Sequence, residues 1–503
     1  IVYTDLTDLK MSNIGSEEAF VNTGGQTKIV GNKMFVYFNG DHTDLRRQVR
    51  EGVATVYLNA MLFGSNLQEI VQNAVMMNLP EWFKDGLISF VGNEWNTEVD
   101  NQLRDLFLSG KYVGFEEMAK ANPRLVGHSL WHFISEHYGH STVSNLLYLT
   151  RINRSVESGF LYVLGATYGK TTESWETFFR QRYEAEVKGM NAPLEGGLVK
   201  FKNKKNLPVT QVKISPDGLK IAYDINEIGR TRVWLQDLAS GKRTLVFKGG
   251  FRNPIQATDY QYPLLAWSPT NTELAVLYEQ RAAPKLLKYN VLNKDKVTED
   301  LAPLFQRVYS MDYVNANDLV FSAAVRGQSD LYLYFTVTRQ SLRLTTDFWD
   351  DLDASFVNVH GQRGVLFASN RQDSLNVIAA LDTILPITTF DIFYLNLDSL
   401  QGELVRVTNT PHANEREPLA LDTTWFSFLT DESGVFNRKN GYLEDYLHHF
   451  ENRVIFNDGI ELRYHVDTVL SEKLDSAVFA QIDTVILDTI YKQRAVTHFA
   501  TNY

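Results

Sequence analysis

The strongest constraint on the fold is a pattern of strands and turns that recurs along the second half of the sequence. Its first copy reads VTQVKISPDGLKIAYDINEIGRTRVWLQDLASGKRTLVF, in which short apolar strands are separated by Ser-Pro-Asp-Gly, glycine and Ser-Gly turns. Further copies contain, in order, LLAWSPTNTELAVLYEQ, VYSMDYVNANDLVFSAAV, ASFVNVHGQRGVLFASNRQ and EPLALDTTWFSFLTDESG. Each copy spans roughly forty to fifty residues, and one copy alone could not bury both faces of its strands. The copies must therefore pack against one another.

A repeat of this length with four short strands is typical of one blade of a β-propeller. We expect the propeller to occupy residues 208–465, with the fifth copy ending in a fourth strand near HHFENRVIF. Because RYHVDTVLSEKLDSAVFAQ could begin another blade, the sequence predicts five to six four-stranded blades. Residues 466–503 then form either the last blade or a docking tail. Residues 375–389, LNVIAALDTILPITT, interrupt one blade either as a rigid exposed arm or as two ordered pieces brought together.

Two copies share a motif in their third strands, at Asp330–Tyr334 and Asp391–Leu395. Both copies end in an Arg-x-Thr motif, at Arg343–Thr345 and Arg406–Thr408. Together with the Ser-Pro-Asp-Gly turn, these motifs resemble the propellers of the TolB family and the related WD40-like PD40 repeats. The resemblance implies a fold rather than an activity. The same class of propeller caps prolyl oligopeptidases, yet the sequence contains no G-x-S-x-G motif, and its tail is too short for an α/β-hydrolase.

The first third of the sequence has a different period. Residues 1–40 alternate as strands and turns, as in KIVGNKMFVYFNG, whereas apolar residues recur three and four apart between residues 44 and 186. We therefore expect an α+β domain, mostly helical, over residues 1–187. Glycines, prolines and lysines between residues 188 and 207 indicate a linker to the propeller.

Two segments of the helical region occur together in a known family. QVREGVATVYLNAML is followed by LPEWFKDGLIS, and this order resembles the gluzincin metallopeptidases of the peptidase MA-like group, in which an H-E-x-x-H helix precedes a P-x-W-hydrophobic-x-E-G helix. In that resemblance Gln48 and Gly52 stand at the two histidine ligands, Val49 at the general base and Asp85 at the third ligand. Zinc catalysis requires imidazole ligands and a base for the bound water. The resemblance therefore implies a pseudo-peptidase, a domain without activity that holds no metal and no other cofactor.

A zinc metallopeptidase with other ligands is the alternative to this interpretation. His128 and His132 are four residues apart on an expected helix and could share a metal with His42 and with Asp85 or Glu51. The apolar residues between the two histidines favour a packed helix face instead, and the segment GHSLW resembles a core segment of peptidase MA-like proteins. Zinc content after purification distinguishes the two interpretations.

Charge and composition exclude several kinds of partner. The net charge is −11, which provides no positive field for nucleic acid or anionic lipid, and no cysteine is present for disulfides or thiolate metal sites. No apolar run is long enough to span a bilayer as a helix. Since the sequence begins IVYTDL, we expect any signal peptide to have been removed or to lie outside these residues, where a lipid anchor would also lie.

A gluzincin-like domain followed by a TolB-like propeller resembles exported Bacteroidota proteins described as translocation protein TolB-like. The resemblance implies a periplasmic or outer-membrane-associated, non-catalytic scaffold within a complex of envelope proteins, for example in outer-membrane protein assembly or secretion. Membrane contact would come only through a partner or an anchor. A propeller that binds peptides or glycans is the alternative, with Trp349, Asp350 and Asp351 of TTDFWDDLD as binding residues. A turn between blades with solvated acids is the simpler interpretation of those three residues.

Overall fold

A small sheet begins the chain in the computed structural model of residues 1–503. The structure describes residues 1–12, 21–23, 27–30, 33–64, 77, 79–191, 199, 201–203, 205–253, 258–359, 361–372, 386–399, 404–456, 461–465 and 479–500. The first elements are β1 (Val2–Tyr3), α1 (Leu6–Met11), β2 (Val21–Thr23), β3 (Thr27–Val30) and β4 (Lys33–Tyr37). The strands lie in the order β1-β4-β3-β2, with β1 parallel to β4 and the other pairs antiparallel. Strands are therefore present in the region where the sequence predicts them.

Helices follow from residue 42 to residue 186. They are α2 (His42–Phe63), α4 (Glu81–Gly92), α5 (Thr97–Leu108), α6 (Gly114–Ala121), α7 (Pro123–Tyr138), α8 (His140–Asn153), α9 (Val156–Leu164) and α10 (Tyr168–Glu186). Asp41, Asn96 and Thr167 cap three of them, because each side chain accepts a hydrogen bond from a backbone N–H of the first turn. The helical region is confirmed, whereas its gluzincin-like identity stays a prediction.

Helices α4 and α7 approach each other closely at two glycines. A Cβ atom on Gly86 would overlap the backbone of Gly127, and a Cβ atom on Gly127 would overlap the carbonyl oxygen of Trp82. Beside this crossing, Trp131 Nε1 donates a hydrogen bond to the Phe83 carbonyl oxygen at 3.0 Å. Both tryptophans and Phe83 are buried in the main helical core. GHSLW is thus a core segment, as predicted, and it packs directly on the P-x-W-F segment.

The second half of the chain forms five antiparallel sheets. They are β5 (Val212–Ile214), β6 (Lys220–Glu227), β7 (Arg230–Asp237) and β8 (Arg243–Gly249); β9 (Leu264–Trp267), β10 (Glu273–Gln280), β11 (Ala283–Asn290) and β12 (Lys296–Asp300); β13 (Arg307–Tyr313), β14 (Asp318–Val325), β15 (Gln328–Phe335) and β16 (Gln340–Arg343); β17 (Asp351–Val359), β18 (Gln362–Ser369), β19 (Asp391–Asn396) and β20 (Val405–Arg406); and β21 (Glu415–Ala420), β22 (Trp425–Thr430), β23 (Asn437–Phe456), β24 (Glu461–His465) and β25 (Phe479–Ala495). Apolar side chains from neighbouring sheets share core clusters, which is the packing of propeller blades. The predicted propeller is confirmed, with five blades.

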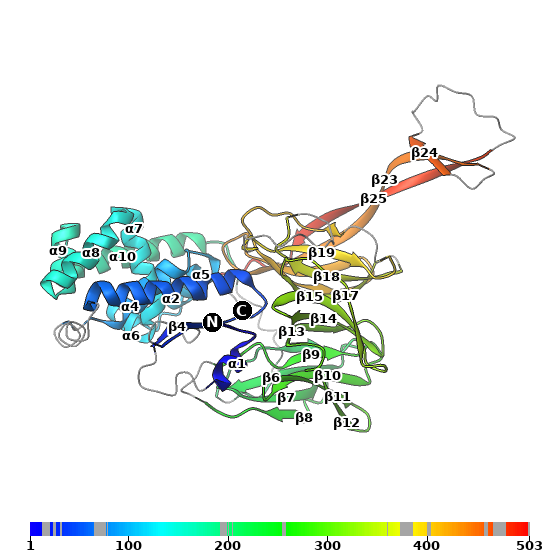
Figure 1. Cartoon of the computed structure of the whole chain (residues 1–503), viewed down its shortest axis with the longest axis horizontal. Coiled ribbons are helices and arrows are strands. Elements are labelled where there is room, and N and C mark those ends of the chain that lie inside the picture. Colours follow the sequence, from blue (N-terminus) through cyan, green and yellow to red (C-terminus); the bar gives the residue numbers. More distant parts are fainter. Residues whose placement is uncertain are drawn as a thin grey trace.

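The fifth blade is built differently from the prediction. HHFENRVIF lies inside the long strand β23, and the fourth place in the blade belongs to β25, which pairs Lys492 to Ala495 with Tyr442 to Lys439. Strand β25 continues beside β23 as far as Phe456, and this ribbon, joined by β24, extends beyond the propeller (Figure 1). The described ends of the segment predicted to begin a sixth blade, Arg463–His465 and Phe479–Gln481, therefore lie in β24 and β25 within this ribbon. No sixth four-stranded blade occurs among the described residues.

Two predicted connections lie only partly within the described residues. Of the insertion at residues 375–389, only residues 386–389 are described. Within the predicted linker, the Asn191 N–H donates a hydrogen bond to the His498 carbonyl oxygen at 2.8 Å, and Asn191 forms a parallel bridge with Phe499. The segment after α10 thus lies beside the end of β25.

The helical part and the propeller touch directly (Figure 1). At the start of α2, the His42 N–H donates to Asp350 Oδ2 at 2.8 Å, and His42 Nδ1 lies 2.6 Å from Asp350 Oδ1. Ser329 Oγ donates to the Gly40 carbonyl oxygen at 2.9 Å. Since Asp350 and Ser329 are buried, these contacts are shielded from water and fix the start of α2 against blades three and four.

Across the described part of the chain, no helix combines the length and the apolar character that crossing a membrane requires.

Candidate functional site

The position expected for the first zinc ligand holds a glutamine that completes a sheet. Gln48 is fully buried; its Oε1 accepts a hydrogen bond from the Tyr37 N–H at 3.1 Å, and its Nε2 donates to the Tyr37 carbonyl oxygen at 2.9 Å. Strand β3 pairs with β4 only as far as Phe35, so the amide takes the place of a strand beyond that point. An imidazole could not do this, because its two nitrogens point apart.

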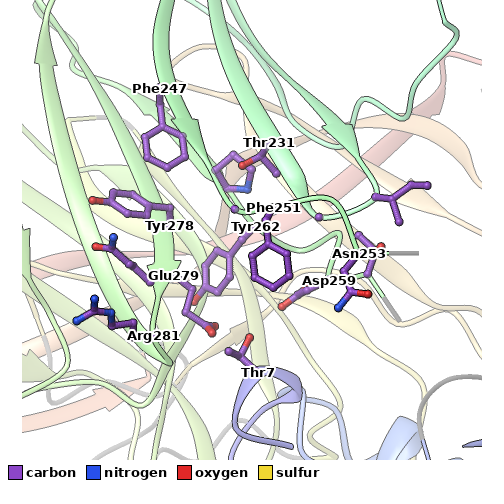
Figure 2. Close-up of a pocket in the computed structure, with 16 residues that line it drawn as sticks. Thr7, Thr231, Phe247, Phe251, Asn253, Asp259, Tyr262, Tyr278, Glu279 and Arg281 are labelled. Carbon is purple, nitrogen blue, oxygen red and sulfur yellow. The ribbon is translucent and has the colours of Figure 1, made fainter. Parts of the chain in front are cut away.

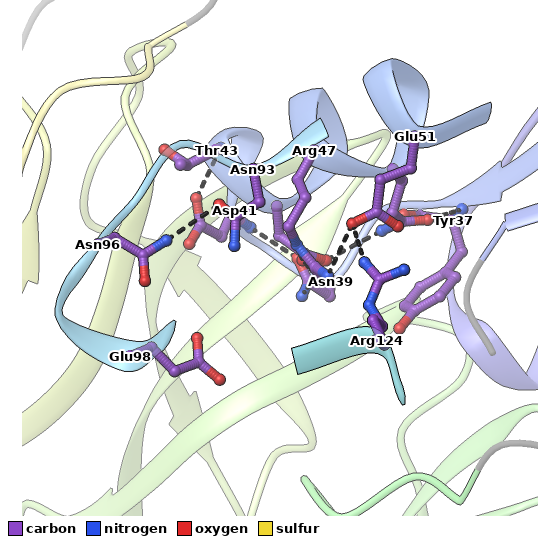
Figure 3. Close-up of polar contacts among 12 residues, drawn as sticks. Tyr37, Asn39, Asp41, Thr43, Arg47, Glu51, Asn93, Asn96, Glu98 and Arg124 are labelled. Atoms are coloured by element: carbon purple, nitrogen blue, oxygen red, sulfur yellow. Dashed lines mark hydrogen bonds and ion pairs between the residues drawn. The ribbon is translucent and has the colours of Figure 1, made fainter. Parts of the chain in front are cut away.

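The buried carboxylate one turn along α2 is held by arginines (Figure 3). Glu51 forms an ion pair with Arg124 of α7 and lies 3.6 Å from Arg47 Nη1, while Arg47 also pairs with Asp44. Burial raises the pKa of Glu51, and the two arginines oppose that rise. A Cβ atom on Gly92 of α4 would overlap the Glu51 side chain, so α4 closes this region from the other side. Two cations and two carboxylates therefore compensate one another where the resemblance places a metal.

The other motif positions offer no zinc ligand set. Gly52 is buried and has no side chain, and Val49 is 37% exposed on the outer face of α2. Asp85 of α4 is exposed. Together with Gln48, the four positions supply a single carboxylate, at the surface, and no nitrogen ligand of the kind that zinc prefers.

The histidines considered as alternative ligands have separate neighbours. His128 Nδ1 lies 3.0 Å from Ser89 Oγ, and burial lowers the pKa of His128 to about 3. The His132 ring stacks on Trp95, with 4.2 Å between ring centroids, and His42 faces the propeller. Over the described ranges, no group of three or more His, Cys, Asp or Glu side chains is placed to hold a metal ion.

The residues predicted to bind a ligand on the propeller are mostly inside it. Asp350 is buried against His42, and both oxygens of buried Asp351 accept hydrogen bonds from Arg371 Nη2, at 2.7 and 2.8 Å. Trp349 is half-buried. A binding role for these three residues stays a prediction, but in this conformation both carboxylates are taken by partners in the same chain.

A hollow of about 610 Å³ lies where α1 meets blades one and two (Figure 2). We call it the aromatic pocket after four rings that line it, Phe247, Phe251, Tyr262 and Tyr278, and Thr7 of α1 lies at its edge. Phe251 is 72% exposed, and the rings of Phe247 and Tyr278 are 4.4 Å apart. A concave site lined by rings with a few polar groups is typical of ligand-binding sites.

Two carboxylates and one arginine meet at the aromatic pocket. Buried Arg307 donates from Nη2 to Asp259 Oδ2 at 2.6 Å and from Nη1 to Glu279 Oε2 at 3.2 Å. The Glu279 side chain is only 10% exposed, and no described group hydrogen-bonds its other oxygen, Oε1. Burial raises the pKa of Glu279 to about 7, although Arg307 and the nearby Thr7 hydroxyl favour the charged form. The pocket therefore holds charges of both signs, since exposed Arg281 also lines it, and the Glu279 oxygen Oε1 is buried with no hydrogen bond of normal geometry from a described residue.

A groove of about 640 Å³ between the helical part and the propeller is less suited to a ligand. Its arginines face carboxylates: Arg50 Nη1 lies 3.0 Å from Glu94, and Arg182 Nη2 lies 3.3 Å from Asp100. Because these charges compensate one another, the groove presents no strong field to an outside molecule.

Sequence reasoning did not find the aromatic pocket. Its residues come from α1 and from two blades, so their meeting depends on how distant segments pack. One local signal was Phe251, an aromatic residue directly after two glycines in KGGFRN. An aromatic residue directly after a glycine turn indicates a ring at the surface, where it can line a binding site.

No family model and no curated protein matches the sequence. Solved structures that resemble part of it include TolB from Acinetobacter baumannii, at 15% identity and a TM-score of 0.35 over 46% of this chain and 51% of that chain. The β-propeller domain of the Trilobed protease from Pyrococcus furiosus is 12% identical, with a TM-score of 0.32 over 46% of this chain and 66% of that one. Putative TolB from Agrobacterium tumefaciens is 16% identical, with a TM-score of 0.29 over 38% and 62%.

The matched region thus spans between half and two thirds of each of these structures. The class of protein is defined by the strands and helices of the chain itself, which form a helical domain docked on a five-bladed propeller.

Proposed function

We propose that this chain is a non-catalytic, protein-binding scaffold of the bacterial cell envelope. The observation that carries the proposal is the pairing of Gln48 with both backbone groups of Tyr37, because it assigns a structural role to the position where a peptidase of this type needs a ligand. The neighbouring carboxylate Glu51 is likewise engaged by Arg124 and Arg47 instead of being free to activate water.

The contact between the two parts of the chain supports the scaffold role. Buried hydrogen bonds of His42 with Asp350 and of Ser329 with Gly40 hold the helical part against the propeller. The surfaces of the helical part and of the propeller are therefore fixed in position and orientation relative to each other. This lowers the entropic cost of binding a partner that contacts both. Stable interfaces bury on the order of 1,600 Å² in total, an area that a chain of this size can supply.

The proposed envelope location is supported by the TolB-like sequence motifs of the propeller repeats, at Asp330–Tyr334 and Asp391–Leu395. We propose a periplasmic or outer-membrane-associated place in a complex with other envelope proteins, and outer-membrane protein assembly or secretion as the process it serves.

Zinc binding by the purified chain tests the non-catalytic part of the proposal. We expect calorimetric titration to show no stoichiometric zinc, and we expect no hydrolysis of casein at neutral pH. One tightly bound zinc that is lost in the Glu51→Gln or His128→Ala variant would contradict the proposal, because it would identify a working ligand set.

A further inference from the structure

We infer that the aromatic pocket receives a lysine side chain from a protein partner. This inference rests on the proposed scaffold function and adds the chemistry of one docking site. It is carried by three features that meet in one hollow: aromatic rings, three carboxylates around Arg307, and a buried carboxylate oxygen to which no described residue donates at normal geometry.

Three of the four rings of the aromatic pocket are held in place before any ligand binds. The Tyr262 hydroxyl donates to the Val308 carbonyl oxygen at 2.9 Å and accepts from the Val308 N–H at 3.0 Å, which fixes its ring. Phe247 and Tyr278 pack against each other, while Phe251 projects into solvent at the mouth (Figure 2). Rings arranged in this way can cover the methylene stem of a long side chain and attract a cation through their faces.

The charges favour a cation over an anion or a neutral group. Arg307 is shared by Asp259 and Glu279, and Asp5, at the start of α1, adds another acidic group that acts on Glu279. Arg281 lines the pocket but is exposed. Glu279 is surrounded from two sides. The N-terminal segment contributes Thr7 and Asp5, and the propeller contributes Asp259 and Arg307. A buried carboxylate oxygen without a donor is costly, and a positive ligand would remove that cost.

The geometry selects lysine over arginine. Glu279 Oε2 accepts a hydrogen bond from Arg307, so Oε1 is the oxygen of this carboxylate that is left to a ligand, and a side chain must move to expose it because Oε1 is buried. A guanidinium binds a carboxylate best through two parallel hydrogen bonds, whereas an ammonium group is a point charge that one oxygen can accept. Asp259 cannot complete a fork, because its two oxygens accept from Arg307 Nη2 and from the Gln261 N–H.

Ligand-observed NMR on the full chain tests this inference with Nα-acetyl-lysine methylamide as the probe. A ligand of this size is expected to bind with a Kd on the order of 1 mM, which saturation-transfer experiments detect. We expect saturation of the side-chain methylenes by the wild type and at least about tenfold weaker binding to the Glu279→Gln variant. Affinity should also fall between pH 8 and pH 6, because Glu279, with a pKa of about 7, takes up a proton.

Matched probes and variants distinguish a lysine site from a purely apolar one. Nα-acetyl-norleucine methylamide, which lacks the ammonium group, should not bind, and Phe251→Ala should weaken lysine binding several-fold without disturbing the fold, since this ring is mostly exposed. Glu184→Gln, on the exposed surface of α10, should have no effect.

Three outcomes would overturn the inference: equal binding of the norleucine probe, lysine binding unchanged by both pocket variants, or no lysine binding to a folded chain. Competition by N-acetylglucosamine at lower concentration than lysine would also overturn it and indicate a glycan site. Recovery of a stoichiometric envelope partner would still support the scaffold function in each of these cases, so the two proposals fail separately.

Discussion

Gln48 satisfies both backbone groups of Tyr37 at the point where β3 stops pairing with β4. Gln48→Ala would leave a buried N–H and a buried carbonyl without partners, and each such group costs about 1–3 kcal/mol. We expect the free energy of unfolding in urea to fall by about 2–4 kcal/mol. Val49→Ala, on the outer face of the same helix, should change it by less than about 0.5 kcal/mol. Equal stability of the two variants would contradict the structural role of Gln48.

Glu279 should make stability depend on pH. Its pKa is about 7 in the folded chain, above the ordinary value of 4.5, so the folded state binds the proton more tightly than the unfolded state. The contribution of this group to stability is therefore fully present below pH 4.5 and is lost as the pH rises through 7. The amide introduced by Glu279→Gln cannot titrate, so the stability of this variant relative to wild type should increase by about 1–3 kcal/mol between pH 5 and pH 8.

Urea unfolding at the two pH values measures this difference. Glu184→Gln serves as the control, because an exposed carboxyl should give the same stability relative to wild type at both pH values. A constant difference between Glu279→Gln and wild type would show that Glu279 ionises normally in the folded chain.

Single residues were predictable from the sequence only where their neighbours are local. The apolar residues of GHSLW follow the helical period, which predicts a core segment. The partner of Gln48 is a strand that precedes α2, and the partner of Glu279 is Arg307, 28 residues away on another strand. Periodicity carries no information about such pairs, so the sequence could mark Gln48 as a missing ligand but could not give its structural role.

At the scale of elements, the crossing of α4 over α7 depends on having no side chain at Gly86. A Cβ atom there would overlap the backbone of Gly127, which cannot move without separating the helices. We expect Gly86→Ala to lower the free energy of unfolding by about 1–3 kcal/mol, despite the higher helix propensity of alanine.

Thermal unfolding of Gly86→Ala and Gly169→Ala checks this contact. Gly169 lies in the first turn of α10, and a Cβ atom there meets nothing within 4 Å, so its replacement should leave the melting temperature unchanged or slightly raised. If both variants melted at the same temperature as wild type, the close approach of α4 and α7 would be refuted.

The blades show which elements the sequence could predict. In blades one to three, consecutive strands are joined by short turns or loops, and the alternation of apolar residues between turns identifies them. Blade five takes its fourth strand from β25, which begins 23 residues after β23 ends at Phe456. The pattern of HHFENRVIF predicts a fourth strand, whereas the segment continues the third strand, β23. Alternation identifies a strand but not its neighbour.

At the scale of the whole molecule, Asp350 fixes the helical part to the propeller through His42. Asp350→Ala removes the acceptor for the His42 N–H and ring, so we expect backbone amides of residues 38–44 to exchange with deuterium about tenfold faster or more. Hydrogen-exchange mass spectrometry measures this directly. Asp398→Ala is the control, because its ion pair with Arg363 is exposed and lies within blade four. Unchanged exchange in Asp350→Ala would mean that this contact does not hold the two parts together.

The mutual placement of the two parts lay beyond the sequence. His42 and Asp350 are 308 residues apart, and both have simpler local interpretations, as a residue at the start of a helix and as an acid in a turn. The docking of α1 against blades one and two, which forms the edge of the aromatic pocket, likewise joins segments far apart in the sequence and has no local sequence signal. Sequence repeats and helical periods therefore predicted the two parts, while the surfaces between them followed only from the structure.

The most direct test of the scaffold function is gentle extraction of the protein from the native cell envelope, followed by native mass spectrometry. We predict a stoichiometric complex with at least one other envelope protein, with no zinc bound to this chain. A chain recovered alone, carrying one zinc ion and hydrolysing peptides, would contradict the account.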